Sequence, residues 1–222
     1  MNGEYDYEPV PGLPEKLPAG ERILWQGAPR WQHLAIDAYL ARLLGGYFAL
    51  LLLWRVANGL TSGEPLPRVL QASAGLFVLA VAAVALLTLL AYLSSRTTLY
   101  TVTNRRVVIR HGIALPMTIN LPFSIIEAGA LKTAADGHGE IALALDKQTR
   151  VGYMLTWPHV RRWHITRPQP ALRGLQDAAG VAMLLTDAMA DAHGAALVTS
   201  PVAVSEGNGK VLGLRPGTRV TA

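Results

Sequence analysis

The longest apolar stretch in the chain lies between Arg68 and Arg96, and it has no charged residue from Val69 to Ser95. A helix needs about 20 predominantly apolar residues to cross the hydrocarbon core of a bilayer, and this stretch can do so with some tilt. The alternative is a buried helix of a soluble protein, but such helices seldom run this far without a charge. The pattern therefore predicts a transmembrane helix at residues 69–93.

A shorter apolar stretch, Leu43–Trp54, precedes the first one and is too short to span a bilayer alone. Extension to residues 38–58 gives enough length and includes Arg42 and Arg55, one near each end. Both arginine side chains are long enough to place their charge at the membrane surface. We therefore expect a second transmembrane helix at residues 38–58, and the two helices together form a hairpin.

The linker of this hairpin, Gly59–Pro67, is short and contains no Lys or Arg. Basic residues on the other side of the hairpin come before the first helix and after the second. Because positive residues concentrate on the cytoplasmic side of a membrane, both termini are expected in the cytoplasm. The basic residues that carry this argument are Arg22, Arg30, Arg42, Arg96, Arg105, Arg106 and Arg110.

Beyond Arg96, apolar and polar residues alternate, as is typical of β-strands with one buried face. The segment Thr103–Arg106 reads as a tight turn, since Asn104 tolerates the left-handed backbone conformation. Pro122 cannot donate a ladder hydrogen bond, so it favours a strand at the edge of a sheet. We predict short antiparallel strands at residues 99–103, 107–111, 119–123, 141–145 and 151–155.

One amphipathic helix is expected to close this region, with Pro168 and Pro170 before it and Gly194 near its end. Its apolar face is predicted to contain Leu172, Leu175, Ala179, Ala182, Leu185 and Met189. Several antiparallel strands followed by one helix match a pleckstrin-homology-like (PH-like) architecture. The predicted fold is thus an α+β membrane protein: an N-terminal cytoplasmic arm (1–37), a transmembrane hairpin (38–95), a cytoplasmic PH-like domain (96–193) and a flexible tail (194–222).

Composition agrees with a membrane segment and removes several kinds of chemistry. Hydrophobic residues make up 51% of the chain and charged residues 16%, whereas an average soluble domain carries about 25% charged residues. The absence of cysteine excludes disulfides, thiolate metal sites and thiol nucleophiles. The acidic start of the chain gives no indication of a signal peptide.

Candidate catalytic and cofactor-binding patterns were sought among the remaining residues. No two of the six histidines have the spacing of a helical metal motif, and His159 and His164 lack carboxylates nearby in sequence. Neither predicted membrane helix contains a histidine that could ligate a metal. There is no phosphate-binding loop and no nucleophile elbow. We therefore expect a protein that is not an enzyme and has no metal or cofactor.

Charge is distributed unevenly. From Arg96 onward there are 14 Lys and Arg residues against 8 Asp and Glu, a net charge of +6, whereas the preceding part has −1. A basic domain tethered to a membrane is attracted to anionic lipid headgroups. Nucleic-acid binding is the competing interpretation, but the basic residues are spread out and not interleaved with aromatic ones.

Candidate partner-binding residues lie in two places. Gly45 and Ala49 are four positions apart, a spacing that lets two membrane helices approach closely. The exposed cytoplasmic candidates are Trp157, His159, Arg161 and Arg162, because Trp and Arg are enriched at binding hot spots. Ordinary packing within the domain is the alternative role for the second group.

Four segments carry a resemblance to a known family: LPAGERILWQGAPRW, RTTLYTVTNRRVVIRHGIALPMTINLPF, WPHVRRW and PQPALRGLQDA. The chain resembles the photosynthetic complex assembly protein family (PuhB) over residues 17–190. The YTVTNRR hairpin is general to bacterial PH-like domains and indicates the fold alone. The segments ALPMTINLPF and WPH are what indicate the assembly family.

This resemblance implies a non-enzymatic assembly factor for the photosynthetic reaction centre–light-harvesting 1 core complex of purple bacteria. Its partners would be reaction-centre or light-harvesting 1 membrane subunits, and its location the bacterial inner (photosynthetic) membrane. The alternative is a generic membrane-anchored PH-like module that binds lipid or peptide. Whether the protein forms a homo-oligomer, and which subunit it binds, stay open at this point.

Overall fold

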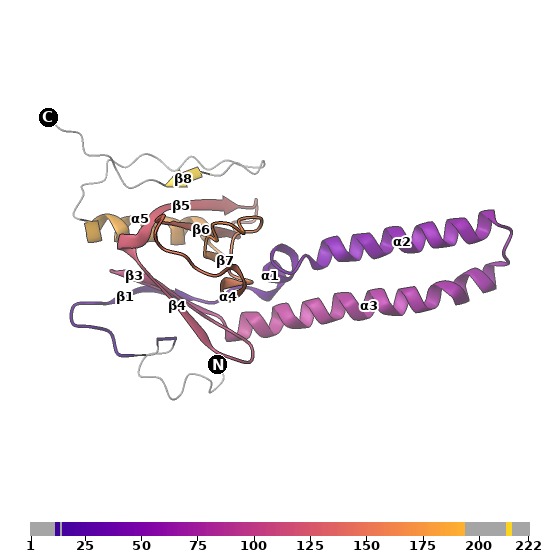
Figure 1. Cartoon of the computed structure of the whole chain (residues 1–222), viewed down its shortest axis with the longest axis horizontal. Helices are drawn as coiled ribbons and strands as arrows, with labels where there is room; N and C mark the ends of the chain where they lie inside the picture. The colour runs from indigo at the N-terminus through magenta and orange to yellow at the C-terminus, as the bar shows by residue number, and fades with distance from the viewer. Residues whose placement is uncertain (1–11, 14, 194–211, 215–222) are drawn as a thin grey trace.

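The computed structural model describes residues 12–13, 15–193 and 212–214. Figure 1 shows a long helical hairpin, α2 and α3, that projects from a domain of strands and shorter helices. Two four-stranded antiparallel sheets and the helix α5 make up most of this domain. The predicted order of apolar hairpin, antiparallel sheets and final helix is confirmed.

The hairpin consists of α2 (Ala41–Thr61) and α3 (Leu66–Thr97). Both helices are long and apolar enough to cross a membrane. Only 6% of the most apolar 18-residue stretch of α2, and 11% of that of α3, is buried. The helices end later than the predicted spans, 38–58 and 69–93, because helical hydrogen bonding continues beyond the apolar residues. Near the linker the two helices approach closely: a Cβ at Gly59 would lie 2.8 Å from a methyl group of Val69.

The first sheet has the order β1–β2–β3–β4. Its strands are β1 (Ile23–Gly27), β2 (Leu99–Thr103), β3 (Arg106–His111) and β4 (Met117–Pro122). The predicted tight turn joins β2 to β3, where Val102 pairs with Val107. The strand with Pro122 lies at a sheet edge, as predicted.

β1 precedes the hairpin in sequence but pairs with β2, which follows it. The whole hairpin is therefore inserted between two neighbouring strands of one sheet. Sequence analysis did not predict this strand, because five residues between Arg22 and Ala28 are too few to establish an alternating pattern.

The second sheet has the order β7–β6–β5–β8. Its strands are β5 (Ile126–Thr133), β6 (Gly139–Leu145), β7 (Ala171–Leu175) and β8 (Leu212–Leu214). β8 lies in the segment predicted to be a flexible tail; the rest of that tail is outside the described residues.

The helical assignment of Leu172 and Leu175 was wrong, because both belong to β7. All five residues of β7 are buried, so the segment has no polar face that would reveal a strand period. Gly174 has a positive φ of 66°, which a helix does not allow. The closing helix, α5 (Ala178–His193), begins directly after Asp177, whose carboxylate accepts a hydrogen bond from the Gly180 amide.

The strand predicted at residues 151–155 was also wrong. Tyr153–Thr156 forms one short helix, α4, and the Thr156 hydroxyl donates to the carbonyl of Gly152. A short 3₁₀-helix, η1 (Phe123–Ile125), follows β4.

The core lies between the two sheets and is closed by α5. Fully buried members come from both sheets, for example Tyr100 and Ile109 in the first and Leu143 and Leu172 in the second. Leu185 of α5 is 2% exposed. The predicted packing of an amphipathic final helix is confirmed for Ala182, Leu185 and Met189, whereas Ala179 is only partly buried and does not belong to the core.

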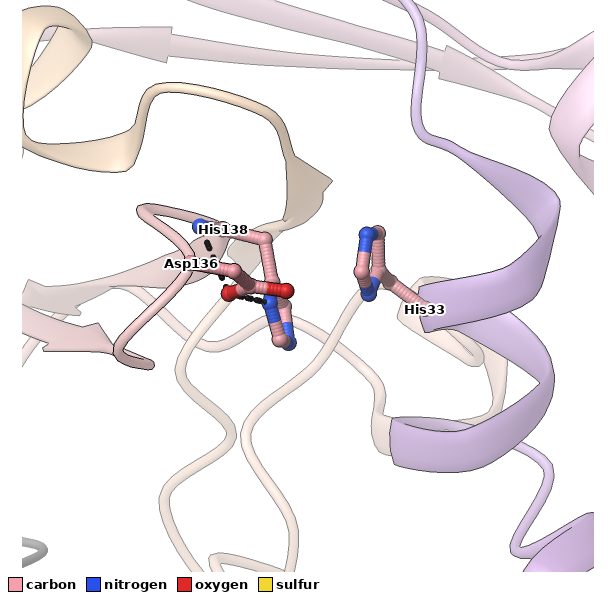
Figure 2. Close-up of side chains that lie close together, drawn as sticks. All are labelled: His33, Asp136 and His138. Carbon is pink, nitrogen blue, oxygen red and sulfur yellow. Dashed lines mark hydrogen bonds and ion pairs between the residues drawn. The ribbon is translucent and has the colours of Figure 1, made fainter.

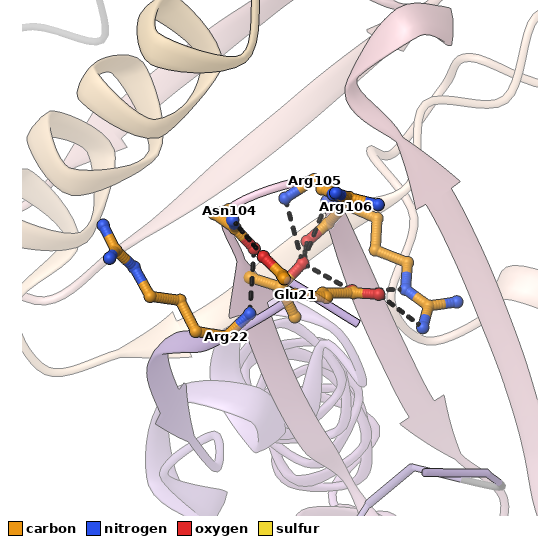
Figure 3. Close-up of polar contacts among 7 residues, drawn as sticks. Glu21, Arg22, Asn104, Arg105 and Arg106 are labelled. Carbon is orange, nitrogen blue, oxygen red and sulfur yellow. Dashed lines mark hydrogen bonds and ion pairs between the residues drawn. The ribbon is translucent and has the colours of Figure 1, made fainter. Parts of the chain in front are cut away.

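A polar cluster joins the segment before β1 to the β2–β3 turn (Figure 3). The Arg106 guanidinium contacts both carboxylate oxygens of Glu21, at 2.7 and 3.1 Å. Thr103 donates to the same carboxylate, and Asn104 bonds the backbone of Gly20 and Arg22. These bonds fix the N-terminal segment to the first sheet on one side of the hairpin insertion.

Candidate functional site at the base of the hairpin

The short helix α1 (Trp31–Asp37) connects the first sheet to the hairpin and packs against both α3 and β7. A second small core forms there from Leu34, Ala35, Tyr39 and, on α3, Ala91. The hairpin is therefore joined to the domain through buried contacts on both of its arms, and not through a free linker.

Arg173 of β7 is the polar centre of this joint, with its side chain only 3% exposed. Its guanidinium donates at 2.7 Å to the carbonyl of Asp37, at the end of α1. Its Nε lies 2.9 Å from a carboxylate oxygen of Glu140, close enough for an ion pair although the N–H is not aimed for a hydrogen bond. Charge pairing and backbone acceptors together offset the cost of burying this arginine.

His159 and Tyr100 form a second buried group beside Arg173. The Tyr100 hydroxyl lies 2.7 Å from His159 Nδ1, and the Thr98 hydroxyl lies 2.9 Å from Nε2. Thr98 already donates its one proton to the carbonyl of Ser94, so His159 Nε2–H must be the donor to Thr98. Nδ1 then accepts from Tyr100, which describes a neutral imidazole with both nitrogens satisfied.

Burial holds the pKa of His159 well below its usual 6.5, and nearby His111 and Arg173 lower it further. Burial likewise lowers the pKa of His111, whose ring lies 5.2 Å from that of His159. The exposure predicted for His159 was wrong, since none of its surface is accessible. It belongs to the joint between hairpin and domain, where it cannot touch a partner directly.

The other cytoplasmic candidates do reach the surface. Trp157 is 43% exposed, and its ring meets that of Tyr39 edge-on at 5.0 Å. Arg161 and Arg162 are partly exposed and line an open cavity of about 520 Å³ beside the start of α2. We call Trp157, Arg161, Arg162 and Trp163 the hairpin-base surface.

This cavity combines apolar and cationic groups. Leu40 and Leu43 line its hairpin side, and Trp163 lies at its rim, 85% exposed. Lys132, Arg161 and Arg162 contribute positive charge, while the carboxylate of Glu140 also faces Arg173. A surface of this kind suits an anionic group next to an apolar one.

Further exposed apolar side chains lie on the same segment as the hairpin-base surface, and others lie on the β3–β4 turn. Met154 and Ile165 are 84% and 66% exposed, and Leu115 is 77% exposed. Scattered apolar residues at a surface are ordinary, so these three side chains do not by themselves define a binding face.

The hairpin candidates Gly45 and Ala49 have different environments. Gly45 is partly buried and faces α3, where a Cβ would lie 4.0 Å from Val84. Ala49 is exposed. Of the two, only Ala49 therefore presents an open surface to another helix.

A cluster that sequence analysis missed lies on the domain side of α1 (Figure 2). It brings His33 next to Asp136 and His138, which follow about a hundred positions later on the β5–β6 turn. The spacing Asp-Gly-His was visible in sequence as a turn, but nothing in the sequence indicated that His33 would meet it.

Comparison with known proteins shows which family has this architecture. The family model "Bacterial PH domain" matches residues 39–187, which include the hairpin, strands β2 to β7 and most of α5. The chain belongs to the bacterial PH domain family. It is 41% identical over 188 residues to a Rhodobacter capsulatus protein, described as an uncharacterized 23.7 kDa protein in the puhA 5′ region, covering 83% of this chain and 87% of that one. No solved structure matches the chain.

Proposed function

We propose that this protein is a membrane-anchored, non-enzymatic assembly factor for the photosynthetic reaction centre–light-harvesting 1 core complex. The observation that carries the proposal is the 41% identity to a protein of the puhA 5′ region along most of both chains. The resemblance of ALPMTINLPF and WPHVRRW to the photosynthetic assembly family points the same way.

The hairpin supports membrane anchoring. Its apolar side chains are exposed along both helices, for example Leu50 at 65% and Leu79 at 57%. Water would penalise that much exposed apolar surface, whereas lipid would not. We infer two membrane spans, with the domain and both termini in the cytoplasm because the flanking basic residues lie on that side.

The joint between hairpin and domain supports a positioning role. Because α1, α3 and β7 pack together, the domain is held at a fixed distance and orientation above the membrane. The hairpin-base surface then faces the lipid headgroups and the cytoplasmic ends of neighbouring membrane helices. Anionic headgroups can occupy the cationic cavity while exposed Trp157 and Trp163 contact a subunit.

A deletion strain compared with its parent tests the assembly role. We expect less core complex by absorption spectroscopy and by blots of its membrane subunits, with pigment synthesis retained. Complementation by the full chain should restore the level. Complementation by an Arg161→Ala/Arg162→Ala variant that still inserts normally should restore it only in part.

Unchanged core-complex levels in the deletion strain at several growth stages would contradict the proposal. The remaining function would then be a generic membrane-anchored module for lipid or peptide. The cationic cavity beside α2 favours anionic lipid as its ligand, which vesicle flotation with and without anionic lipid would measure.

A further inference from the structure

A group of potential metal ligands lies where α1 meets the β5–β6 turn (Figure 2). His33 comes from α1, and Asp136 and His138 come from the turn; one ligand atom of each lies within 4.8 Å of the others. From this geometry we propose that His33, Asp136 and His138 bind one divalent transition-metal ion, with Zn²⁺ as the reference ion. The site is independent of the assembly role proposed above.

Two imidazoles and one carboxylate are donors that Zn²⁺ accepts together, with water in a fourth position. In a tetrahedral site the ligand atoms lie about 2.0–2.1 Å from the ion. The three ligand atoms now lie up to 4.8 Å from one another, so they must move closer together to bind one ion. Asp136 is exposed and lies on a turn, which leaves it free to make this movement.

Asp136 and His138 already face one another. His138 Nδ1 and Asp136 Oδ1 form a hydrogen bond, in which a neutral imidazole shares its one N–H proton with the carboxylate. A bound ion would take the place of that proton, which can move to His138 Nε2. Asp37 Oδ2 lies 3.9 Å from Nε2 and would have to come closer to accept this proton. It would then be the outer carboxylate partner that metal-bound histidines commonly have.

His33 supplies the second imidazole from the opposite side. Its ring stacks on that of His138 with centroids 3.7 Å apart and planes 17° from parallel. Parallel rings cannot both direct a lone pair at one ion, so His33 has to rotate, and its partial exposure permits this.

The ion would connect α1 to the second sheet. α1 leads directly into α2, and its end is already bonded to Arg173 through the carbonyl of Asp37. A metal bridge at His33, one helical turn earlier, would add a second fixed point. Metal binding would then stiffen the joint that sets the orientation of the hairpin.

The test uses the full chain, without a histidine tag, purified in detergent micelles and treated with chelator. Titration with ZnCl₂ in a calorimeter at pH 7.5 should show saturable binding of one ion per chain. Co²⁺ in its place should give the visible absorption of a tetrahedral site. His33→Gln and His138→Gln should each lower affinity at least about tenfold, as loss of even an outer partner does.

The matched control is His164→Gln, a partly exposed histidine whose ring contacts the carbonyl of Arg162. It should bind zinc like the wild type, and all variants should show the wild-type melting temperature in chelator. Absence of saturable binding would overturn the proposal. Binding that survives His33→Gln would also overturn it, since a surface ion on the turn alone needs no residue from α1.

Discussion

Leu50 and Leu185 are both leucines in helices, but Leu50 of the hairpin is 65% exposed and Leu185 of α5 is 2% exposed. The domain uses apolar residues on one helix face or in both sheets to make a core. The hairpin has apolar residues on all sides and buries few of them. This contrast is what we expect if the domain is surrounded by water and the hairpin, as proposed above, by lipid.

The hydrogen-bond partners of buried and half-buried polar side chains also differ between the domain and the hairpin. In the domain several bond across elements, as Glu21 does with Arg106 and Arg173 with Asp37, although Thr156 bonds within α4. In the hairpin, Ser73 and Thr88 each donate at 2.8 Å to the carbonyl four residues earlier in their own helix. Bonding within one helix is what a lipid environment demands, because lipid offers polar groups no partner.

The largest effect is expected from a charge in the core of the domain. Leu185→Asp would bury a carboxylate between α5 and the sheets and remove the packing of the leucine. Together these changes should lower the free energy of unfolding by about 4 kcal/mol. The variant should lose its resistance to proteolysis. The control is Met183→Asp in the same helix, where the native side chain is 53% exposed; this variant should resist proteolysis like the wild type. Equal resistance of both variants to proteolysis would mean that α5 is not packed against the sheets.

The next effect is a charge on the hairpin. Leu50→Arg places a cation near the middle of α2, where insertion into lipid costs about 2.5–3.5 kcal/mol. We expect less chain in the membrane fraction. Met183→Arg is similarly exposed and should change stability by no more than about 0.5 kcal/mol. If the two substitutions were equally harmless, the hairpin would lie in water and not in lipid.

Acid should destabilise the joint between the two regions. His111 and His159 have pKa values lowered by burial, so the unfolded chain binds more protons than the folded one below pH 6.5. Stability is therefore fully present above pH 6.5 and falls as pH drops, by about 1.4 kcal/mol per pH unit for each proton excluded.

Thermal melting of the protein in micelles between pH 7.5 and 5 measures this loss. His111→Gln should flatten the dependence, and His164→Gln should leave it unchanged. A melting temperature that does not vary between pH 7.5 and 5 in the wild type would show that these rings are not held neutral by the fold.

The smallest effect concerns contact between the hairpin helices. Gly59→Ala brings a methyl group to 2.8 Å from Val69, whereas a Cβ at Gly46 meets nothing within 4 Å. Gly59→Ala should destabilise the hairpin by about 1 kcal/mol through overpacking, and Gly46→Ala should not. Melting of both variants in micelles compares them; equal values would mean that the helices do not touch near their linker.

Residues that act locally could be predicted from the sequence. The uninterrupted apolar run before Arg96 predicted α3, and the alternation around Asn104 predicted the β2–β3 turn, because each depends on neighbours in sequence. The buried β7 strand was read as a helix, because a segment buried on both faces shows neither period. Strand β1 and the burial of His159 depend on contacts with residues far away in sequence.

The candidate site followed the same rule. Arg161, Arg162 and Trp157 were found because Trp and Arg stand out by type. The structure leaves all three at least partly exposed, and Arg161 and Arg162 line the cavity beside α2. The joint formed by Arg173, Tyr100 and His159 has no sequence signal, since its partners lie far apart in sequence, for example 59 positions for Tyr100 and His159 and 136 for Asp37 and Arg173. Because of this joint, the hairpin is packed against the domain and is not attached to it by the chain alone.

Photo-crosslinking in the native membrane tests most directly whether the hairpin-base surface binds a subunit of the core complex. A photoreactive amino acid would replace Trp163, which is 85% exposed, and in a second strain Met183 on α5. We predict a product that joins the Trp163 position to a reaction-centre or light-harvesting 1 subunit, with none from Met183. Absence of any such subunit from the Trp163 product, while the variant supports normal core-complex levels, would contradict the account.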